Sequence, residues 1–220
     1  MGVTKKALII GATGLVGKTL LAQLEASPDY RSIISISRSQ LSTKSKKTTH
    51  ILTDFHHLDS YENAFAVDDI FCCIGTTLKE IKSLDLYKII ELYFPKTIAR
   101  LGKQNNAKSI AIISCIGANP ESPNYYLSIK GKLEEIIQAF DFESTHIYRP
   151  SLITGKRKTT RFKELLVHPF CSLCRFIPFL SQFAPVSASQ LAKAMLFNTL
   201  LDKKGTFYYT RDSILNHKEN

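Results

Sequence analysis

The sequence lacks the features that divide a chain into separate domains. It contains no Pro-, Gly- or Ser-rich linker, no internal repeat and no low-complexity tract. Its 220 residues, 44% hydrophobic and 22% charged, have the composition of a globular protein and are enough to bury one core. We therefore expect a single domain over residues 1–220, and the composition excludes disordered and collagen-like chains.

Long hydrophobic runs are also missing. The first apolar run, Ala7-Leu8-Ile9-Ile10, is far shorter than a spanning or secretory segment and has no cleavage-type region behind it. We expect no membrane span and a cytoplasmic location. An aromatic-rich segment, Phe162 to Phe183, is broken by Pro169 and Pro178 and lacks a repeated basic face. Packing onto the core, or closing as a lid over an apolar pocket, is preferred to membrane attachment.

Cysteine is scarce and its number is odd, which argues against a disulfide framework. The five residues are Cys72, Cys73, Cys115, Cys171 and Cys174, and three of them lie in or beside apolar strand-like runs. We expect reduced, buried thiols. The CxxC of Cys171 and Cys174 lies near His168, but a zinc ion would need a fourth ligand that this neighbourhood does not supply. The sequence therefore predicts no metal site.

Basic residues exceed acidic ones, which gives a net charge of +10. The excess is concentrated at residues 44–47 and 156–163. Such clusters are usually solvated loops, and they attract phosphate without specifying which phosphate. Nucleic acid is therefore disfavoured as a partner, while a phosphorylated dinucleotide would use some of this charge. The oligomeric state stays open, and a homo-oligomer is compatible with the sequence.

Short apolar runs alternate with segments of helical periodicity. Strands are predicted at Ala7 to Ile10, Ile33 to Ser37, Ile51 to Thr53, Ile70 to Ile74, Ser109 to Ser114, Thr145 to Tyr148 and Thr206 to Thr210. Helices are predicted at Leu15 to Ala26, Leu84 to Gln104, Tyr126 to Phe140 and Ser187 to Leu201. This alternation predicts an α/β, doubly wound parallel sheet of the Rossmann type. The pattern changes after Pro150, so residues 151–220 are expected to form a small elaboration on the substrate side.

A glycine-rich turn follows the first predicted strand and opens the first helix. It runs Gly11-Ala12-Thr13-Gly14-Leu15-Val16-Gly17, and its first two glycines are separated by two residues, where the commonest fingerprint has one. A residue without a Cβ permits the tight turn and lets a pyrophosphate approach the backbone. The helix end then offers free N–H groups to the anion. The turn predicts a dinucleotide site.

The ends of the next strands suggest which dinucleotide is bound. Arg38 stands where an NAD site would place Asp or Glu, and a guanidinium suits a 2′-phosphate, so NADP(H) is favoured over NAD(H). Asp54 and Phe55 follow the third strand and could meet the adenine, although Asp54 could equally cap a helix. Gly75 and Thr76 end the fourth strand, where cofactor contacts are expected.

A tyrosine and a lysine are placed to act together. Tyr126 and Lys130 are four residues apart, so on a helix they share one face. A neighbouring ammonium favours the phenolate and makes Tyr126 a usable acid or base. Ser114 could hold a substrate oxygen beside the phenol, but adjacent strand positions face opposite ways. Whether Ser114 or Cys115 faces the site stays open.

These segments together resemble the short-chain dehydrogenase/reductase superfamily in its extended or atypical branch. The resemblance rests on GATGLVG, CCIGTT, SCIGANPES, YYLSIKGKLE and YRPSLITGKR, in this order over nearly the whole chain. It is strongest toward the Tat-interacting-protein-like NAD(P)-binding oxidoreductases. It implies a Rossmann fold, NADP(H) at the glycine turn and Arg38, a Tyr126 and Lys130 pair, and Pro150 beside the cofactor. Members of that branch often have Ser where this chain has Cys115.

Two classes of function fit these residues. The first is an NADP(H)-dependent oxidoreductase of a small carbonyl or alcohol, with Tyr126 as proton donor, Lys130 as its activator and Ser114 as hydroxyl partner. The second is a non-catalytic NADP(H)-binding regulatory protein that binds a protein or nucleic-acid partner.

Overall fold

The main sheet has seven parallel strands. The computed structural model describes residues 4–76, 81, 83–155 and 184–216. The strands are β1 (Lys5–Ile10), β2 (Tyr30–Ser37), β3 (Thr48–Leu52), β4 (Asp69–Cys72), β5 (Ser109–Ile113), β6 (Ser144–Tyr148) and β9 (Gly205–Tyr209). Their order across the sheet is β3-β2-β1-β4-β5-β6-β9, and every neighbouring pair is parallel. The predicted doubly wound parallel sheet is confirmed.

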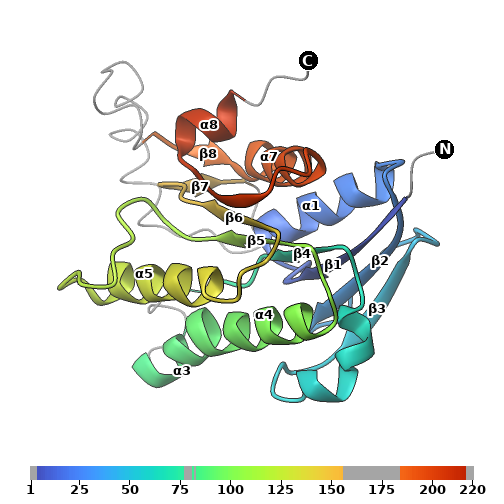
Figure 1. Cartoon of the computed structure of the whole chain (residues 1–220), viewed down its shortest axis with the longest axis horizontal. Helices are drawn as coiled ribbons and strands as arrows, with labels where there is room; N and C mark the ends of the chain where they lie inside the picture. Colours follow the sequence, from blue (N-terminus) through green and yellow to red (C-terminus); the bar gives the residue numbers. More distant parts are fainter. Residues whose placement is uncertain (1–3, 77–80, 82, 156–183, 217–220) are drawn as a thin grey trace.

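Helices cover both faces of this sheet (Figure 1). One face carries α1 (Leu15–Ala26), α7 (Ala188–Leu200) and α8 (Arg211–Leu215), and the other carries α3 (Leu84–Lys88), α4 (Phe94–Gln104) and α5 (Tyr125–Gln138). A 3-10 helix, η1 (Leu58–Phe65), joins β3 to β4 and packs against α4. The sequence did not predict α8, which is short, and it indicated η1 only as a helical stretch that Asp54 could cap.

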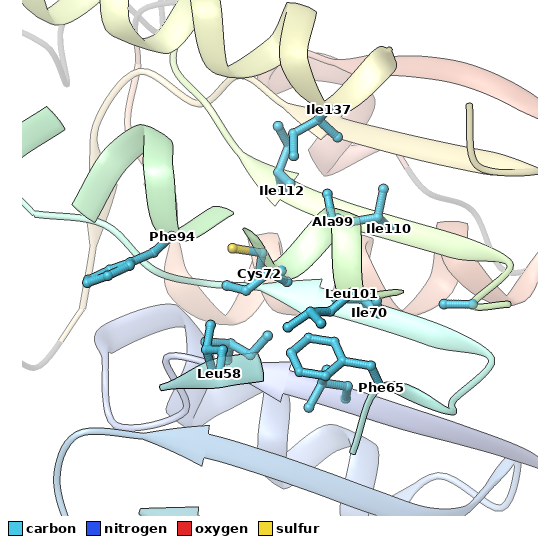
Figure 2. Packing of buried hydrophobic residues seen from close by; sticks show 14 of the residues in the cluster. Leu58, Phe65, Ile70, Cys72, Phe94, Ala99, Leu101, Ile110, Ile112 and Ile137 are labelled. Atoms are coloured by element: carbon cyan, nitrogen blue, oxygen red, sulfur yellow. The ribbon is translucent and has the colours of Figure 1, made fainter. Parts of the chain in front are cut away.

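The inner strands contribute side chains to two separate cores, one on each face of the sheet. In β1, Leu8 and Ile10 belong to the core beneath α4 and α5, whereas Ala7 and Ile9 belong to the core beneath α1 and α7. This division follows from the pleat of a strand that is buried on both faces. Figure 2 shows the first core, in which Ile70, Cys72, Ile110 and Ile112 from the sheet meet Leu58, Phe65, Leu101 and Ile137 from the covering helices.

The segment after Pro150 divides between the main sheet and a smaller unit. Strand β7 (Ile153–Thr154) pairs in parallel with β8 (Val186–Ser187) to form a separate two-stranded sheet. Helix α7 and strand β9 instead complete the main sheet and its covering layer. The predicted lid or core segment, Phe162 to Phe183, and the CxxC of Cys171 and Cys174 lie outside the described residues.

The long helix predicted over Leu84 to Gln104 contains a local widening. Between α3 and α4 lies one π-helical turn, η2 (Ile89–Tyr93), in which the Phe94 N–H donates to the carbonyl of Ile89. Pro95 explains it, because a proline has no N–H to give to the carbonyl four residues earlier and its ring crowds that carbonyl. The carbonyl four residues before Pro95 is that of Glu91.

Two negative findings apply to the described part of the chain. No helix there is long and apolar enough to cross a membrane. No group of three or more metal-ligating side chains gathers there either. Cys72, Cys73 and Cys115 are free thiols, and burial raises the pKa of Cys72 to about 11.

Candidate active site

The glycine turn is built so tightly that two of its positions exclude a side chain. Gly11 has a φ of +87°, and a Cβ on it would lie 2.7 Å from the carbonyl oxygen of Cys73. A Cβ on Gly17 would lie 2.2 Å from the carbonyl oxygen of Gly11. Glycine is therefore required both where the turn meets β4 and where α1 meets the turn.

The first turn of α1 contains no side chain that would compete with an anion. Gly14 is the N-cap residue, so it offers no side chain to bond the free N–H groups, and the first helical turn contains no acidic residue. Thr13 and Gly14 are exposed, while Val16 is buried against the sheet. The predicted anion-binding site is therefore accessible to solvent at Thr13 and Gly14, and the buried Val16 side chain fixes the start of α1 to the core.

Arg38, Asp54 and Phe55 follow the two strands next to β1. Arg38 is exposed directly after β2. Asp54 is exposed, and its carboxylate accepts a hydrogen bond from the backbone N–H of His56 at 3.0 Å. The same carboxylate lies 3.1 Å from Nδ1 of the His57 ring. This contact with His57 is the main reason that the pKa of Asp54 is lowered. The 3-10 helix after it has His57, not Asp54, as its N-cap. Phe55 is buried, with its ring 5.5 Å from that of Phe94, so its side chain belongs to the core.

The loop after β4 is tied to the tyrosine and lysine pair through a residue that the sequence did not single out. Glu91 is 1% exposed, and its Oε1 accepts a short hydrogen bond from the backbone N–H of Thr76. Its Oε2 lies 2.7 Å from Nζ of Lys130. The same Nζ donates to the carbonyl of Ile113 at 3.0 Å. Glu91 therefore connects the loop after β4 to α5, and Lys130 extends this connection to the end of β5.

Lys130 stays charged although it is buried. Burial by itself lowers the pKa of an ammonium, but the Glu91 carboxylate more than offsets that effect and leaves the pKa of Lys130 raised from its ordinary value of 10.5. A lysine with that pKa remains a cation over the whole physiological range, as the proposed pairing with Tyr126 requires.

The phenol of Tyr126 meets a thiol. The Tyr126 side chain is hydrogen-bonded to that of Cys115. Burial raises the pKa of the Cys115 thiol. The hydrogen bond from Tyr126 and the positive charge of Lys130 act in the opposite direction but do not cancel the rise. Ser114 is buried, and its Oγ has no hydrogen-bond partner among the described residues. The backbone N–H of Ser114 donates to Tyr148 at 2.7 Å, which fixes the end of β5 against β6.

The segment after β6 supports the same edge of the sheet. The carbonyl of Pro150 accepts the N–H of Ile116 at 3.0 Å. Arg149 forms a two-pronged ion pair with Glu134 of α5, and its guanidinium lies 4.3 Å from the Tyr208 ring centre. Gly155 then approaches the glycine turn, since a Cβ there would lie 2.7 Å from Leu15.

Comparison with known proteins places these features in a family, although no established family profile matches the chain. A protein of Debaryomyces hansenii called FMP52, mitochondrial, is 30% identical over 190 residues, which cover 85% of this chain and 84% of that protein. The chain belongs to the FMP52 family. The rat protein HTATIP2 is 29% identical over 170 residues, covering 76% of this chain and 70% of that protein. The resemblance to the Tat-interacting-protein-like proteins is thereby confirmed.

Solved structures share the fold of this FMP52-family chain at low sequence identity. MoeE5 in complex with UDP-glucuronic acid and NAD superposes with a TM-score of 0.72 at 15% identity, covering 92% of this chain and 75% of that one. The UDP-glucose 4-epimerase from Bifidobacterium longum in complex with NAD+ and UDP superposes with a TM-score of 0.68 at 17% sequence identity. The match covers 93% of this chain and 77% of that one. These similarities support the Rossmann-type fold and nothing more specific.

The expected cytoplasmic location is wrong. The FMP52 relatives from Debaryomyces hansenii, Scheffersomyces stipitis and Candida albicans are named as mitochondrial proteins. The expectation rested on the absence of a secretory leader, and such an absence does not separate the cytoplasm from the mitochondrion.

Sequence reasoning missed Glu91, although the sequence carried a signal for it. Glu91 falls on the apolar face of its helix, in register with Tyr87 and Ile98, where a carboxylate needs a partner. Pro95, four residues later, marks the break in the helical hydrogen bonds.

A shallow groove lined by Ser32, Ile51 and Tyr61 lies elsewhere, between the outer strands and η1, and none of the Tyr126 neighbours lines it.

Proposed function

We propose that this FMP52-family chain is an NADP(H)-dependent oxidoreductase that acts on a small carbonyl or alcohol. One observation carries the proposal: Tyr126, Cys115 and Lys130 are brought together at the edge of the sheet where β4 and β5 end. Parallel strands direct their carboxyl ends to one edge, and β1 delivers the glycine turn to that same edge. This common edge supports a dinucleotide seat beside Tyr126 and Lys130.

The residues present fit a dinucleotide. The closely packed glycines leave room for a pyrophosphate at the start of α1, and the exposed Arg38 at the end of β2 suits a 2′-phosphate. The residues proposed to hold the dinucleotide are Gly11, Thr13, Gly14, Leu15, Val16, Gly17, Arg38, Asp54, Phe55, Gly75, Thr76, Tyr126, Lys130 and Pro150. Phe55 would contribute through its backbone, because its ring is buried.

Each catalytic side chain has a separate task in this proposal. Tyr126 donates the proton to the substrate oxygen, because its ring is partly exposed at the site and its hydroxyl can reach a ligand. Lys130 stabilises the phenolate that remains. A second hydrogen-bond partner for the substrate oxygen comes from Ser114 or Cys115, and the contact with Tyr126 favours Cys115. The nicotinamide, when bound, supplies the hydride.

The thiol also gives a specific reason to keep a second function. Sulfur is a weak hydrogen-bond donor, so Cys115 is a poor replacement for a hydroxyl beside a reacting oxygen. A chain with this substitution could bind NADP(H) without turnover and act as a regulatory protein toward a protein or nucleic-acid partner.

A single experiment separates the two functions. Purified protein is first titrated with NADPH, and NADPH oxidation is then followed against a panel of small aldehydes and ketones. Binding with oxidation of at least one carbonyl supports the oxidoreductase. Binding without oxidation across the panel supports the regulatory protein, and an absence of binding contradicts both.

Two further properties follow as proposals. The names of the FMP52 relatives make the mitochondrion the location to test, by imaging a tagged chain. We also infer that residues 1–220 act as one domain, because β9, close to the C-terminus, completes the sheet begun by β1.

A further inference from the structure

A buried carboxylate joins the two halves of the proposed site. Glu91 contacts the Thr76 N–H with one oxygen and Lys130 Nζ with the other. Thr76 follows β4 on the proposed cofactor side, whereas Lys130 lies on α5, one helical turn after Tyr126. Both carboxylate oxygens are thus engaged by protein groups, and the residue is 1% exposed.

The backbone at Glu91 is adapted to this position. Pro95 would collide with the Glu91 carbonyl in a regular α-helix, and the chain avoids the collision by one π-helical turn. Extra width at this turn changes the direction of the side chains on either side of it. A π-turn is costly to keep, and such turns often occur at functional sites.

We propose that Glu91 is a positioning residue of this site, which fixes Lys130 and the Gly75–Thr76 turn relative to each other so that a dinucleotide meets a preformed site. This inference rests on the proposed function. It concerns a residue that would not touch the cofactor itself, because its two oxygens are already occupied.

Charge explains why a glutamate is needed here. The groups that face Lys130 from neighbouring elements are Glu91 of η2, Tyr87 of α3, Cys72 of β4 and Cys115 after β5. Burial raises the pKa of Tyr87, Cys72 and Cys115, so all three are neutral at physiological pH. Of these groups, Glu91 alone carries the negative charge that keeps a buried Lys130 protonated.

The geometry also limits what Lys130 can do. Lys130 Nζ donates a hydrogen bond to the Ile113 carbonyl at 3.0 Å and forms an ion pair with Glu91 Oε2 at 2.7 Å. These two anchors limit how far the ammonium can move toward a ligand. Loss of the Glu91 charge would release Nζ from one of its two anchors and favour the neutral amine.

The test compares two substitutions of Glu91 by NADPH titration, followed by fluorescence between about pH 7 and pH 10. Glu91→Gln keeps the size and an acceptor for Thr76 but removes the charge, whereas Glu91→Asp keeps the charge. We expect Glu91→Gln to weaken NADPH binding about tenfold at pH 7 and to lose further affinity as pH rises and Lys130 loses its proton. The parent chain and Glu91→Asp should show no such loss with pH.

Glu134→Gln is the matched control, because Glu134 is also buried on the same side of the sheet but pairs with Arg149. It should destabilise the fold without producing the pH dependence. If Glu91→Gln does not fold, the double variant Glu91→Gln/Lys130→Met removes both charges together. Its affinity should then equal that of Lys130→Met alone.

Equal affinities and pH profiles for the parent and Glu91→Gln would overturn the inference and leave the proposed function standing. The inference also fails if Glu134→Gln reproduces the pH dependence, because the effect would then be a general loss of packing. A parent chain that binds neither NADPH nor NADH would overturn the inference and the proposed function together.

Discussion

The side chains of Cys115 and Tyr126 are hydrogen-bonded to each other, although the first is 4% and the second 37% exposed. The thiol is therefore buried at the site, whereas the phenol has access to solvent. Sequence analysis had favoured Ser114 as the hydroxyl partner. Its Oγ is buried and has no partner in the described part of the chain.

Replacing the thiol by a hydroxyl should improve catalysis. Cys115→Ser keeps the size and supplies a stronger donor beside the reacting oxygen, so turnover should rise about tenfold. Ser114→Ala should change turnover by less than about threefold. Steady-state NADPH oxidation with a carbonyl substrate measures both. If Ser114→Ala lost most of its turnover and Cys115→Ser gained none, Ser114 would be the hydrogen-bond partner of the substrate oxygen.

Removal of one phenolic oxygen should separate chemistry from binding. Tyr126→Phe should lower turnover about a hundredfold or more, the usual effect of losing a general acid, while NADPH affinity stays within about twofold. The neighbouring Tyr125 is a matched control, since it is equally exposed and its hydroxyl points to the carbonyl of Leu84 at 3.4 Å. Turnover by Tyr126→Phe at the rate of Tyr125→Phe would remove Tyr126 from the mechanism.

Cofactor choice should depend on Arg38. NADPH should bind more tightly than NADH, and Arg38→Ala should narrow the difference about tenfold, because one charge-assisted contact to phosphate is lost. Arg31→Ala is the control, since Arg31 is also exposed but lies near the opposite end of β2. Calorimetric titration of the three proteins with both dinucleotides gives the six affinities. The assignment fails if the parent chain binds both equally.

Stability should fall in mild acid because of one buried histidine. Burial lowers the pKa of His146 to about 4, and its ring is held by Ser144 at 2.8 Å and Tyr209 at 3.0 Å. The unfolded chain takes up a proton below about pH 6.5 while the folded chain does not, so the free energy of unfolding decreases from pH 6.5 to pH 4. The decrease due to this group is about 3 kcal/mol.

Urea denaturation across that pH range measures the effect. His146→Gln removes the titrating group and should flatten the curve by this amount, even if it lowers the stability at pH 7. Parallel curves for the two proteins would show that other groups cause the acid sensitivity.

Local pattern was sufficient for most of the fold. The helix over Leu15–Ala26 was predicted at its observed bounds, and the strands of the main sheet were predicted to within a few residues. Continuous apolar runs mark the strands, which are mostly buried on both faces, and apolar residues three or four positions apart mark the helices, which bury one face. The elements β7, β8 and α8 escaped prediction because each has too few residues to show a period.

The sequence by itself determined the sheet and the glycine turn, and it placed Tyr126 and Lys130 one helical turn apart, because each of these depends on residues close together in the chain. Only the tertiary structure decided that Cys115 partners the phenol and that Glu91 compensates the lysine. Glu91 and Lys130 are far apart in sequence, and a carboxylate shows no local sign of the cation that it meets. Their contact exists because β4, β5 and the π-turn after α3 converge at one edge of a parallel sheet.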